Sequence, residues 1–242
     1  MKRTADILLS LAGLLFFSPL FFAAMLAVWA QDFRSPFYMA PRVGRNEKIF
    51  RMVKLRSMVV GADRTGVDST SSGDLRITPV GKLVRKYKLD ELTQLWNVFK
   101  GEMSLVGPRP NVKRETDLYT SVEKKLLTVK PGITDISSIV FSDEGEILKD
   151  KPDPDLAYNQ LIRPWKSRLG LLYVEKRSFV LDLKLVFLTA LAVFSRKRAL
   201  EGVSRLLKQM GTDDRLIQIA KRKMPLFPFP PPGAEQVVTS RR

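Results

Sequence analysis

The first thirty residues constrain the fold more than any other part of the chain. From Ile7 to Ala30 the sequence has 24 residues without a charged side chain, enough to cross about 30 Å of hydrocarbon as a straight helix. Ser18-Pro19 lies at the midpoint of this run. Because proline removes a helix hydrogen bond and clashes with the preceding turn, while serine can bond a freed carbonyl, a kink is expected there.

Basic residues flank both ends of the run. Lys2 and Arg3 precede it, and the following basic residues are Arg34, Arg42, Arg45, Lys48, Arg51, Lys54 and Arg56. Basic flanks tend to stay in the cytoplasm. A helix that breaks at Ser18-Pro19 and leaves the membrane by the face it entered would keep both flanks there. A kinked span is the alternative. A cleaved signal peptide is disfavoured, because the run exceeds the usual apolar core of about 7–15 residues and no clean cleavage site ends it.

A second informative segment begins with two adjacent carboxylates, Asp90 and Glu91. An apolar stripe at helical spacing follows them, and it consists of Leu92, Leu95, Trp96 and Phe99. The stripe predicts a helix from about Glu91 to Lys100 with this face in the core, while Thr93, Gln94, Asn97 and Lys100 lie off the stripe. Asp90 is expected to be the N-cap residue, and Gly101 is expected to follow the last turn.

The start of that helix could support chemistry. Free N–H groups and the positive end of the helix dipole favour an ionised Asp90 and would attract a phosphate. A carboxylate held beside a bound phosphate can act as a nucleophile and form an acyl phosphate. The alternative is that Asp90 only caps the helix and Glu91 only complements its dipole.

Composition narrows the chemistry and the partners. The chain has no Cys and no His, so thiolate nucleophiles, histidine bases and Cys-based zinc sites are excluded. A metal would be a hard ion bound through oxygen, for which Mg²⁺ is the natural expectation. The net charge of +16 calls for polyanionic partners. The common nucleic-acid motifs are absent, so anionic membrane lipids and phosphorylated small molecules are expected instead of nucleic acid.

Shorter patterns suggest the elements around the carboxylates. Apolar stretches at 37–39 and 49–54 around residues 44–47 predict a β-hairpin. Residues 61–76 are expected to form a polar loop, and Thr78-Pro79 opens a basic helical turn that carries Arg85. In Gly107-Pro108-Arg109-Pro110 the two prolines fix the backbone, so Arg109 is expected to be held rigidly, as suits a phosphate contact; a structural turn is the alternative.

The second half of the chain contains two further helical patterns. Residues 179–194 are mostly apolar but include Asp182 and Lys184, which predicts a helix lying in the membrane interface or packed on the domain. Residues 213–223 form an amphipathic stretch, and the proline-rich segment 226–232 cannot be helical and should be extended or disordered.

Several of these segments together resemble the bacterial sugar transferase family, the monotopic polyprenyl-phosphate phosphoglycosyl transferases. The resemblance runs from Lys2 to about Ser195. Its motifs are Lys2-Arg3 with Asp6, Ser18-Pro19, Lys54-Leu55-Arg56-Ser57-Met58, Arg76-Ile77-Thr78, Leu89-Asp90-Glu91-Leu92, Asn97-Val98, residues 101–110 from Gly101 to Pro110, and Pro131-Gly132-Ile133-Thr134. This string in this order is highly specific. After Thr134 the chain departs from the family pattern at residues 135–140, a loop expected to border the sugar.

The resemblance implies a phospho-sugar transfer from a UDP-sugar to undecaprenyl phosphate with Mg²⁺. Asp90 would attack the sugar-bearing phosphorus and expel UMP, and the lipid phosphate would then attack the covalent adduct. Glu91 would bind the metal. Phosphate-binding candidates are Lys54, Arg56, Arg85 and Arg109, with Pro108 and Pro110 framing the last.

The implied fold is α+β, mostly helical with a small β-hairpin, held on the cytoplasmic face of a bacterial inner membrane by a re-entrant N-terminal helix hairpin and interfacial amphipathic helices. We expect a re-entrant membrane helix at 1–31, a catalytic domain at 32–198, and an amphipathic helix with a Pro-rich tail at 199–242. The sequence leaves homo-oligomerisation open. Two rival functions are a charge-driven, membrane-tethered binding protein and a non-catalytic scaffold that retains the fold.

Overall fold

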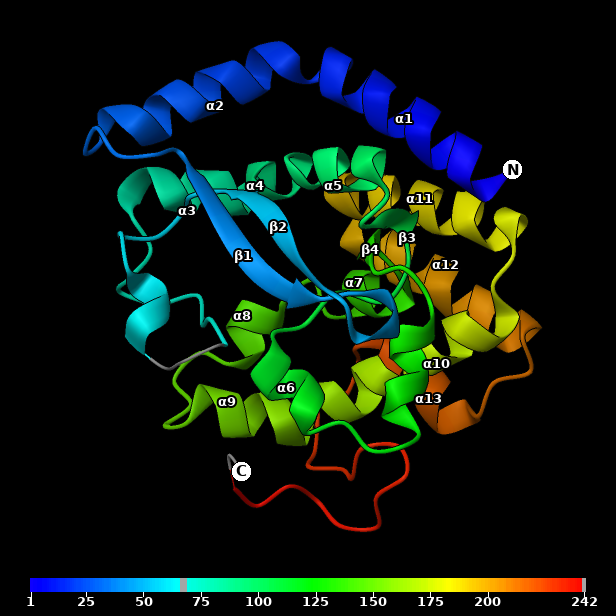
Figure 1. The fold of residues 1–242 in the computed structure, drawn as a ribbon. Helices are drawn as coiled ribbons and strands as arrows, with labels where there is room; N and C mark the ends of the chain where they lie inside the picture. The colour runs from blue at the N-terminus through cyan, green and yellow to red at the C-terminus, as the bar shows by residue number, and fades with distance from the viewer. Residues whose placement is uncertain (66–68, 241–242) are drawn as a thin grey trace.

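Helices make up most of the chain in this computed structural model, which describes residues 1–65 and 69–240 (Figure 1). The predicted polar loop at 61–76 includes residues 66–68, which lie outside the described residues. The helices are α1 (Lys2–Phe16), α2 (Ser18–Ala30), α3 (Pro79–Lys86), α4 (Leu89–Leu92), α5 (Gln94–Lys100), α6 (Lys113–Asp117), α7 (Ile136–Val140), α8 (Glu144–Ile147), α9 (Pro154–Ala157), α10 (Arg163–Lys176), α11 (Phe179–Phe194), α12 (Arg196–Gln209) and α13 (Asp214–Lys221). The strands are β1 (Phe37–Val43), β2 (Ile49–Leu55), β3 (Ser104–Val106) and β4 (Gly132–Thr134).

The predicted β-hairpin is confirmed. β1 and β2 pair antiparallel, from Phe37 opposite Leu55 to Val43 opposite Ile49. Their connection is a 3₁₀ turn, Arg45–Glu47, in which Asn46 and Glu47 adopt positive φ angles of 56° and 61°. The sequence did not predict a second pair, in which β3 and β4 run parallel. Gly132 permits the backbones to meet there, since an added Cβ would lie 2.1 Å from the Gly107 nitrogen.

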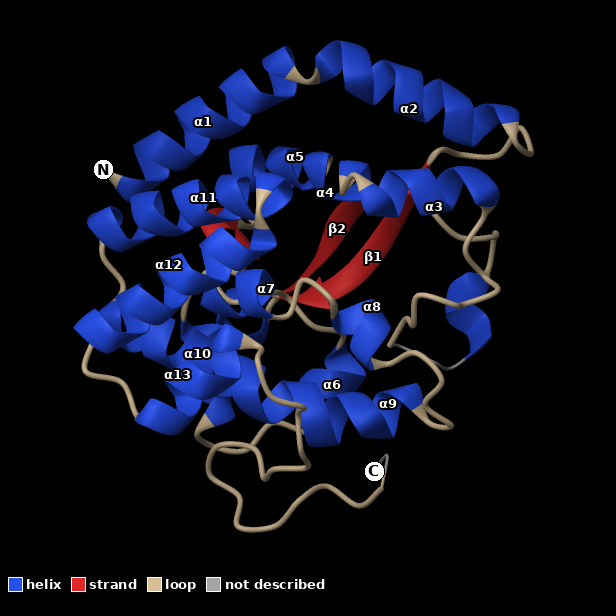
Figure 2. Cartoon of the chain, turned by 180° about the vertical axis from the view of Figure 1, so that it is seen from behind, coloured by secondary structure: helices blue, strands red, loops and turns tan. Residues whose placement is uncertain are grey.

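The N-terminal segment is broken at its midpoint, as the sequence predicts. α1 and α2 are bent by 63° around Phe17, and together they form the arch above the rest of the chain (Figure 2). Ser18 Oγ donates to the Leu15 carbonyl at 2.8 Å, and Pro19 is the second residue of α2. In the described part of the chain, no helix alone has the length and apolar character to cross a membrane, whereas this bent pair does when taken together.

The start of α1 is anchored to the domain by three polar residues. Lys2 Nζ donates to the Val106 carbonyl at 3.0 Å and pairs with Asp182 of α11. Arg3 donates to the Val98 and Phe99 carbonyls at the end of α5. The buried carboxylate of Asp6 accepts hydrogen bonds from the β3 residues Ser104 and Leu105. The arch is therefore fixed to α5, β3 and α11.

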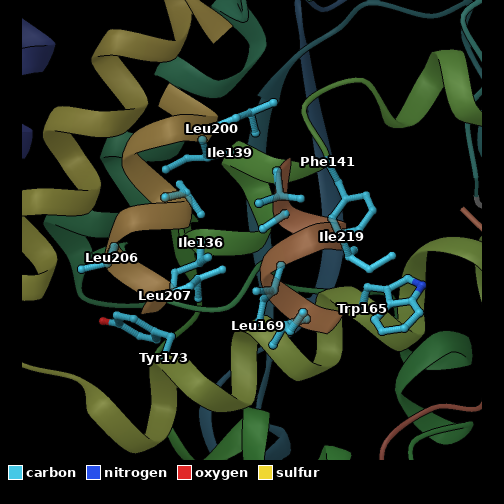
Figure 3. Close-up of a cluster of buried hydrophobic side chains, with 14 of the residues drawn as sticks. Ile136, Ile139, Phe141, Trp165, Leu169, Tyr173, Leu200, Leu206, Leu207 and Ile219 are labelled. Atoms are coloured by element: carbon cyan, nitrogen blue, oxygen red, sulfur yellow. The ribbon is translucent and has the colours of Figure 1, made fainter. Parts of the chain in front are cut away.

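The main hydrophobic core lies below this level, among α7, α10, α11, α12 and α13 (Figure 3). Ile136 and Ile139 of α7 pack there with Leu169 of α10 and Leu207 of α12. The predicted helix at 179–194 is confirmed as α11, which contributes Leu181, Leu185 and Leu188 to this core.

The predicted core face of the helix after Asp90 was wrong. Trp96 is 48% exposed, whereas Thr93, Gln94 and Asn97, predicted to lie off the core face, are buried. The helix lies between the hairpin and α1 (Figure 1), and Leu95 Cδ1 would be 3.0 Å from a Cβ added at Gly13. Its apolar stripe therefore faces α1, because the edge of the hairpin requires polar partners on the other side.

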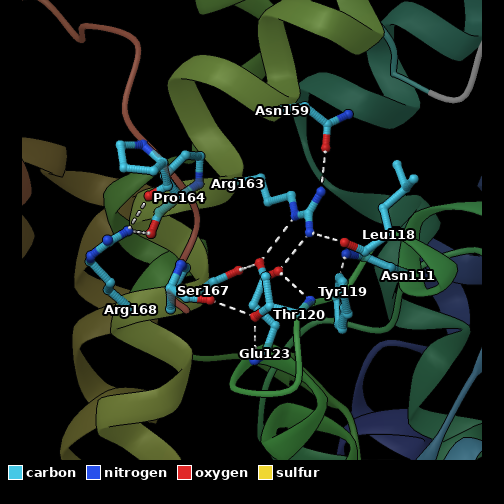
Figure 4. Close-up of polar contacts among 12 residues, drawn as sticks. Asn111, Leu118, Tyr119, Thr120, Glu123, Asn159, Arg163, Pro164, Ser167 and Arg168 are labelled. Carbon is cyan, nitrogen blue, oxygen red and sulfur yellow. Dashed lines mark hydrogen bonds and ion pairs between the residues drawn. The ribbon is translucent and has the colours of Figure 1, made fainter. Parts of the chain in front are cut away.

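The C-terminal segment packs on α10. The predicted stretch at 226–232 has no helix, and Phe229 stacks on Trp165 with ring centroids 4.5 Å apart. A buried polar network lies beneath it, in which Glu123 accepts from Arg163 at 2.6 Å and from Ser167 at 2.6 Å (Figure 4). Thr120 joins this network to the tail by donating to the Pro232 carbonyl.

Candidate active site

A cavity with a volume of about 1150 Å³ contains most of the residues singled out above. It lies between the end of β2, the helices α3 and α4, the segment from α7 to α8, and α11. Among the described residues, nine basic and four acidic side chains line it: Arg34, Arg42, Lys54, Arg56, Arg76, Arg85, Lys88, Arg109 and Lys166, with Asp63, Asp90, Glu91 and Glu144. Such a lining attracts an anionic ligand.

Asp90 lies in this cavity but is not an N-cap residue. The expected cap was wrong, because α4 begins at Leu89 and its N-cap is Lys88, whose φ is +53°. Asp90 therefore occupies the first helical turn, where the helix dipole still favours a negative charge. Its carboxylate is buried, and Oδ2 lies 3.4 Å from Lys54 Nζ. Burial lowers the pKa of the Lys54 ammonium, and the Asp90 charge opposes that shift.

Thr93 and Asn97 hold Asp90 beside Lys54. Thr93 Oγ1 donates to the Val53 carbonyl at 2.8 Å, and Asn97 donates to the Arg51 carbonyl at 2.8 Å and accepts from the Val53 N–H at 2.9 Å. Thr93 separates α4 from α5, so the expected single helix is two short ones. We predicted both residues to lie off the core face; their i, i+4 spacing was the signal for a shared polar face.

Glu91 pairs with Arg109, which comes from the predicted rigid turn. Arg109 Nη2 donates to Glu91 Oε1 at 2.7 Å. Burial alone would raise the pKa of Glu91, but the positive charges of Arg109, Lys88 and Lys54 outweigh it and lower the pKa to about 2. The Glu91 charge in turn raises the pKa of Arg109. Glu91 is therefore ionised at neutral pH.

Arg85 and Arg56 both line the cavity, but they have different partners. Arg85 lines the cavity and donates to Ser57 Oγ at 2.9 Å. Arg56 also lines it, but its guanidinium is held by the Asp32 carboxylate and the Ser35 carbonyl, so it anchors the connection from α2 to β1. This pairing lowers the pKa of Asp32 to about 2.

Four sequence candidates lie outside the cavity lining. Pro108 and Pro110 line a separate small pocket beside Tyr119, so they hold the backbone on either side of Arg109. Ser18 and Pro19 lie at the break of the N-terminal arch. The structure thus brings together Lys54, Arg56, Arg85, Asp90, Glu91 and Arg109.

The acidic residues suit a metal that is bound mainly by substrate. Within the described residues no group of three His, Cys, Asp or Glu side chains could hold an ion. Mg²⁺ commonly takes one or two carboxylates and completes its shell with substrate phosphates and water. The ionised Glu91 beside Asp90 fits that arrangement, since both line a cavity rich in cations that would receive the same phosphates.

Comparison with known proteins identifies the family of this chain. A family model described as bacterial sugar transferase matches residues 1–196. The exopolysaccharide production protein ExoY of Sinorhizobium fredii is 34% identical over 207 residues, which cover 79% of this chain and 84% of that protein.

Two longer relatives have names that describe a reaction. The UDP-glucose:undecaprenyl-phosphate glucose-1-phosphate transferase of Klebsiella pneumoniae is 34% identical over 202 residues, 82% of this chain and 41% of that protein. The undecaprenyl-phosphate galactose phosphotransferase of Salmonella typhimurium is 33% identical over 217 residues, again 82% of this chain and 41% of that protein. The match over residues 1–196 shows that this chain belongs to the bacterial sugar transferase family.

Proposed function

We propose that the chain transfers a sugar 1-phosphate from a UDP-sugar to undecaprenyl phosphate and thereby initiates a surface glycan. The names of its relatives describe transfer of this kind. The observation that carries the proposal is the buried carboxylate of Asp90, which lies 3.4 Å from Lys54 in a cavity whose charged lining residues are mostly cations. A non-catalytic scaffold or a charge-driven binding protein would need no carboxylate inside an anion-attracting cavity.

In the first step, an oxygen of the Asp90 carboxylate attacks the sugar-bearing phosphorus of the donor. The bond from that phosphorus to the bridging oxygen breaks, and UMP leaves with the electron pair. The product on the protein is an aspartyl phospho-sugar. Lys54, Arg85 and Arg109 are placed to neutralise the donor diphosphate and the charge that develops on the leaving UMP.

In the second step, a phosphate oxygen of undecaprenyl phosphate attacks the same phosphorus. The Asp90 carboxylate leaves, and the product is a lipid diphosphosugar. In this scheme each nucleophile is a carboxylate or phosphate oxygen that carries no proton, so neither step needs a base to remove one. This accounts for how a chain without His could perform the reaction.

Glu91 is the residue we assign to Mg²⁺. The bound ion would neutralise charge on the donor phosphates. Arg109 holds Glu91 ionised and oriented through its 2.7 Å contact, so the carboxylate is preformed for a hard cation.

One wall of the cavity suits a lipid acceptor on the cytoplasmic face of a bacterial membrane. α11 contributes Thr189, Ala192 and Val193 to the lining. Along the same helix, Phe187 and Phe194 are 66% and 88% exposed. Exposed apolar surface of this kind favours contact with lipid, so the acceptor phosphate could enter the cavity while its hydrocarbon remains near α11.

A UMP-release assay with a panel of UDP-sugars tests the proposal. Donor alone should release at most about one UMP per protein molecule, because the acyl phosphate waits for its acceptor, and added undecaprenyl phosphate should give repeated turnover. Exhaustive chelation should stop both. If no donor yields UMP in the presence of acceptor and Mg²⁺, the proposed function is wrong; activity that survives chelation removes the metal assignment.

A further inference from the structure

One wall of the cavity is held by the C-terminal helices. Residues 141–145 comprise the connection from α7 to α8 and the first two residues of α8, and four of them line the cavity: Phe141, Ser142, Glu144 and Gly145. Asp143 is not a lining residue. The segment also meets the polar loop, because Ser72 N–H donates to the Gly145 carbonyl at 3.0 Å.

Two arginines contact this wall around Asp143. Arg196, the first residue of α12, has Nη2 2.8 Å from Asp143 Oδ1, and its Nε donates to Ser142 Oγ at 3.1 Å. Arg222, which follows α13, donates from Nη2 to Asp143 Oδ2 at 3.2 Å. Its guanidinium also lies over the Phe141 ring, 5.4 Å from the centroid. Arg196 falls inside the family match at its last position, whereas Arg222 falls outside it.

The position of Arg222 is unfavourable for an arginine. It ends α13 with a φ of +52°, a backbone conformation for which glycine or asparagine is preferred. Its side chain is only 11% exposed, and among the described residues Nε and Nη1 are buried without a hydrogen-bond partner. Neither helix capping nor solubility requires such a side chain. The contacts with Asp143 and Phe141 therefore account for an arginine at this position.

The wall offers groups that differ from those around Asp90. Ser142 presents a hydroxyl, and Glu144 presents a carboxylate paired with Lys166, which also lines the cavity. Ser138 of α7 lines the same side with a second hydroxyl. Hydroxyl and carboxylate groups suit the hydrogen bonds of a sugar, whereas the cations of β2, α3 and the 107–110 turn suit its phosphates.

We propose that Arg222 is a positioning residue that fixes the 141–145 wall through Asp143 and thereby determines how tightly the sugar of the donor binds. The inference rests on the proposed function, since it assigns the sugar subsite of the same cavity. Removing the Arg222 side chain leaves Asp143 paired with Arg196, so the wall should loosen without the protein unfolding.

Steady-state UMP release separates donor binding from chemistry. Arg222→Ala should raise the KM for the best UDP-sugar about tenfold. The reason is that the wall contacts the sugar equally in the bound donor and in the transition state. The kcat and the KM for undecaprenyl phosphate should stay within about twofold of wild type. Arg222→Gly should raise the donor KM equally although it suits the left-handed backbone better. Arg205→Ala, at an exposed position on α12, is the matched control and should change nothing.

Asp143→Asn tests the connection from the other side. It should raise the donor KM by a similar factor, and the double variant Asp143→Asn/Arg222→Ala should be no worse than the poorer single variant, since both remove the same contact. Unchanged donor KM in folded Arg222→Ala and Asp143→Asn proteins overturns the inference, as does a loss confined to kcat. An inactive wild type would instead overturn the proposed function itself.

Discussion

At the scale of single residues, the two adjacent carboxylates have different partners and therefore different tasks. The Asp90 carboxylate lies 3.4 Å from the Lys54 ammonium, whereas Glu91 has a direct 2.7 Å contact with Arg109. A carboxylate in a close guanidinium pair is oriented and stabilised as an anion. The less constrained carboxylate of Asp90 is the better candidate for bond formation with phosphorus.

Asp90→Asn should abolish turnover, because the amide cannot form the acyl phosphate. The loss should be at least about a thousandfold, as expected when a nucleophile is removed. Intact mass spectrometry of wild type incubated with donor alone should show one added phospho-sugar, and the Asn variant should show none. Undiminished turnover in the variant would mean that Asp90 serves only the helix start.

Glu91→Gln should change the pH dependence of stability. The folded pKa of Glu91 is about 2 against an ordinary 4.5, so its ionised form stabilises the fold above about pH 4.5 and this contribution disappears as the pH falls toward 2. The shift corresponds to roughly 3 kcal/mol. Wild type should therefore be more stable than Glu91→Gln at neutral pH, and the difference should shrink between about pH 5 and pH 2.

Chemical denaturation at a series of pH values measures this difference. Glu146→Gln is a matched control, because Glu146 is exposed and should leave the pH dependence close to that of wild type. A stability gap between wild type and Glu91→Gln that stays constant with pH would contradict the ion-pair explanation.

At the scale of elements, patterns within short segments of the sequence predicted three features correctly. The hairpin, the helix at 179–194 and the break before Ser18 all follow from alternation, periodicity and proline. The buried face of α5 and the strands β3 and β4 did not, because they depend on which distant segments lie nearby. β3 and β4 have three residues each, too few for a pattern, and α5 buries its polar side because β2 needs hydrogen-bond partners.

The same distinction applies to the site. The sequence predicted that Asp90 and Glu91 lie together, because they are adjacent in the chain. It also predicted that the two flanking prolines hold Arg109. Sequence could not show that Arg56 is engaged by Asp32, since that pair joins two segments 24 residues apart. Nor could it show that Arg222 reaches the cavity wall from the far end of the chain.

We predict that both ends of the arch lie on the cytoplasmic side of the membrane. Basic residues flank both ends, and α1 and α2 are bent by 63°. The chain has no Cys, so single probes at Thr4→Cys and Arg34→Cys are clean. Both should resist a membrane-impermeant thiol reagent in intact cells and react once the cytoplasm is opened. Labelling of the residue-4 probe from outside would show a straight span.

Pro19→Ala adds a test of the break itself. By restoring a helix hydrogen bond it should straighten α1 and α2 and move a fraction of molecules toward a spanning state. External labelling at residue 4 should rise and activity should fall in proportion. Pro36→Ala, in the loop after α2, is the matched proline control and should leave the labelling pattern unchanged.

At the scale of the whole molecule, the C-terminal helices complete a core that begins in the family-matched region. Residues 1–196 match the family model, yet Leu200, Val203 and Leu207 of α12 pack with Ile136 of α7 and Leu169 of α10. The tail extends this packing, since Phe229 stacks on Trp165 and its N–H donates to the Gln160 carbonyl at 3.1 Å. We therefore expect unfolding of the tail to be coupled to unfolding of the core.

Phe229→Ala should lower the free energy of global unfolding by about 2 kcal/mol, less than the value for a fully buried ring because Phe229 is half-buried. Met224→Ala, at a 61% exposed position of the same tail, should cost less than about 0.5 kcal/mol. Hydrogen exchange distinguishes coupled from local unfolding: in Phe229→Ala the amides of α10 and α12 should exchange faster together with those of the tail. Faster exchange in the tail alone, with global stability unchanged, would show that the tail is attached without stabilising the core.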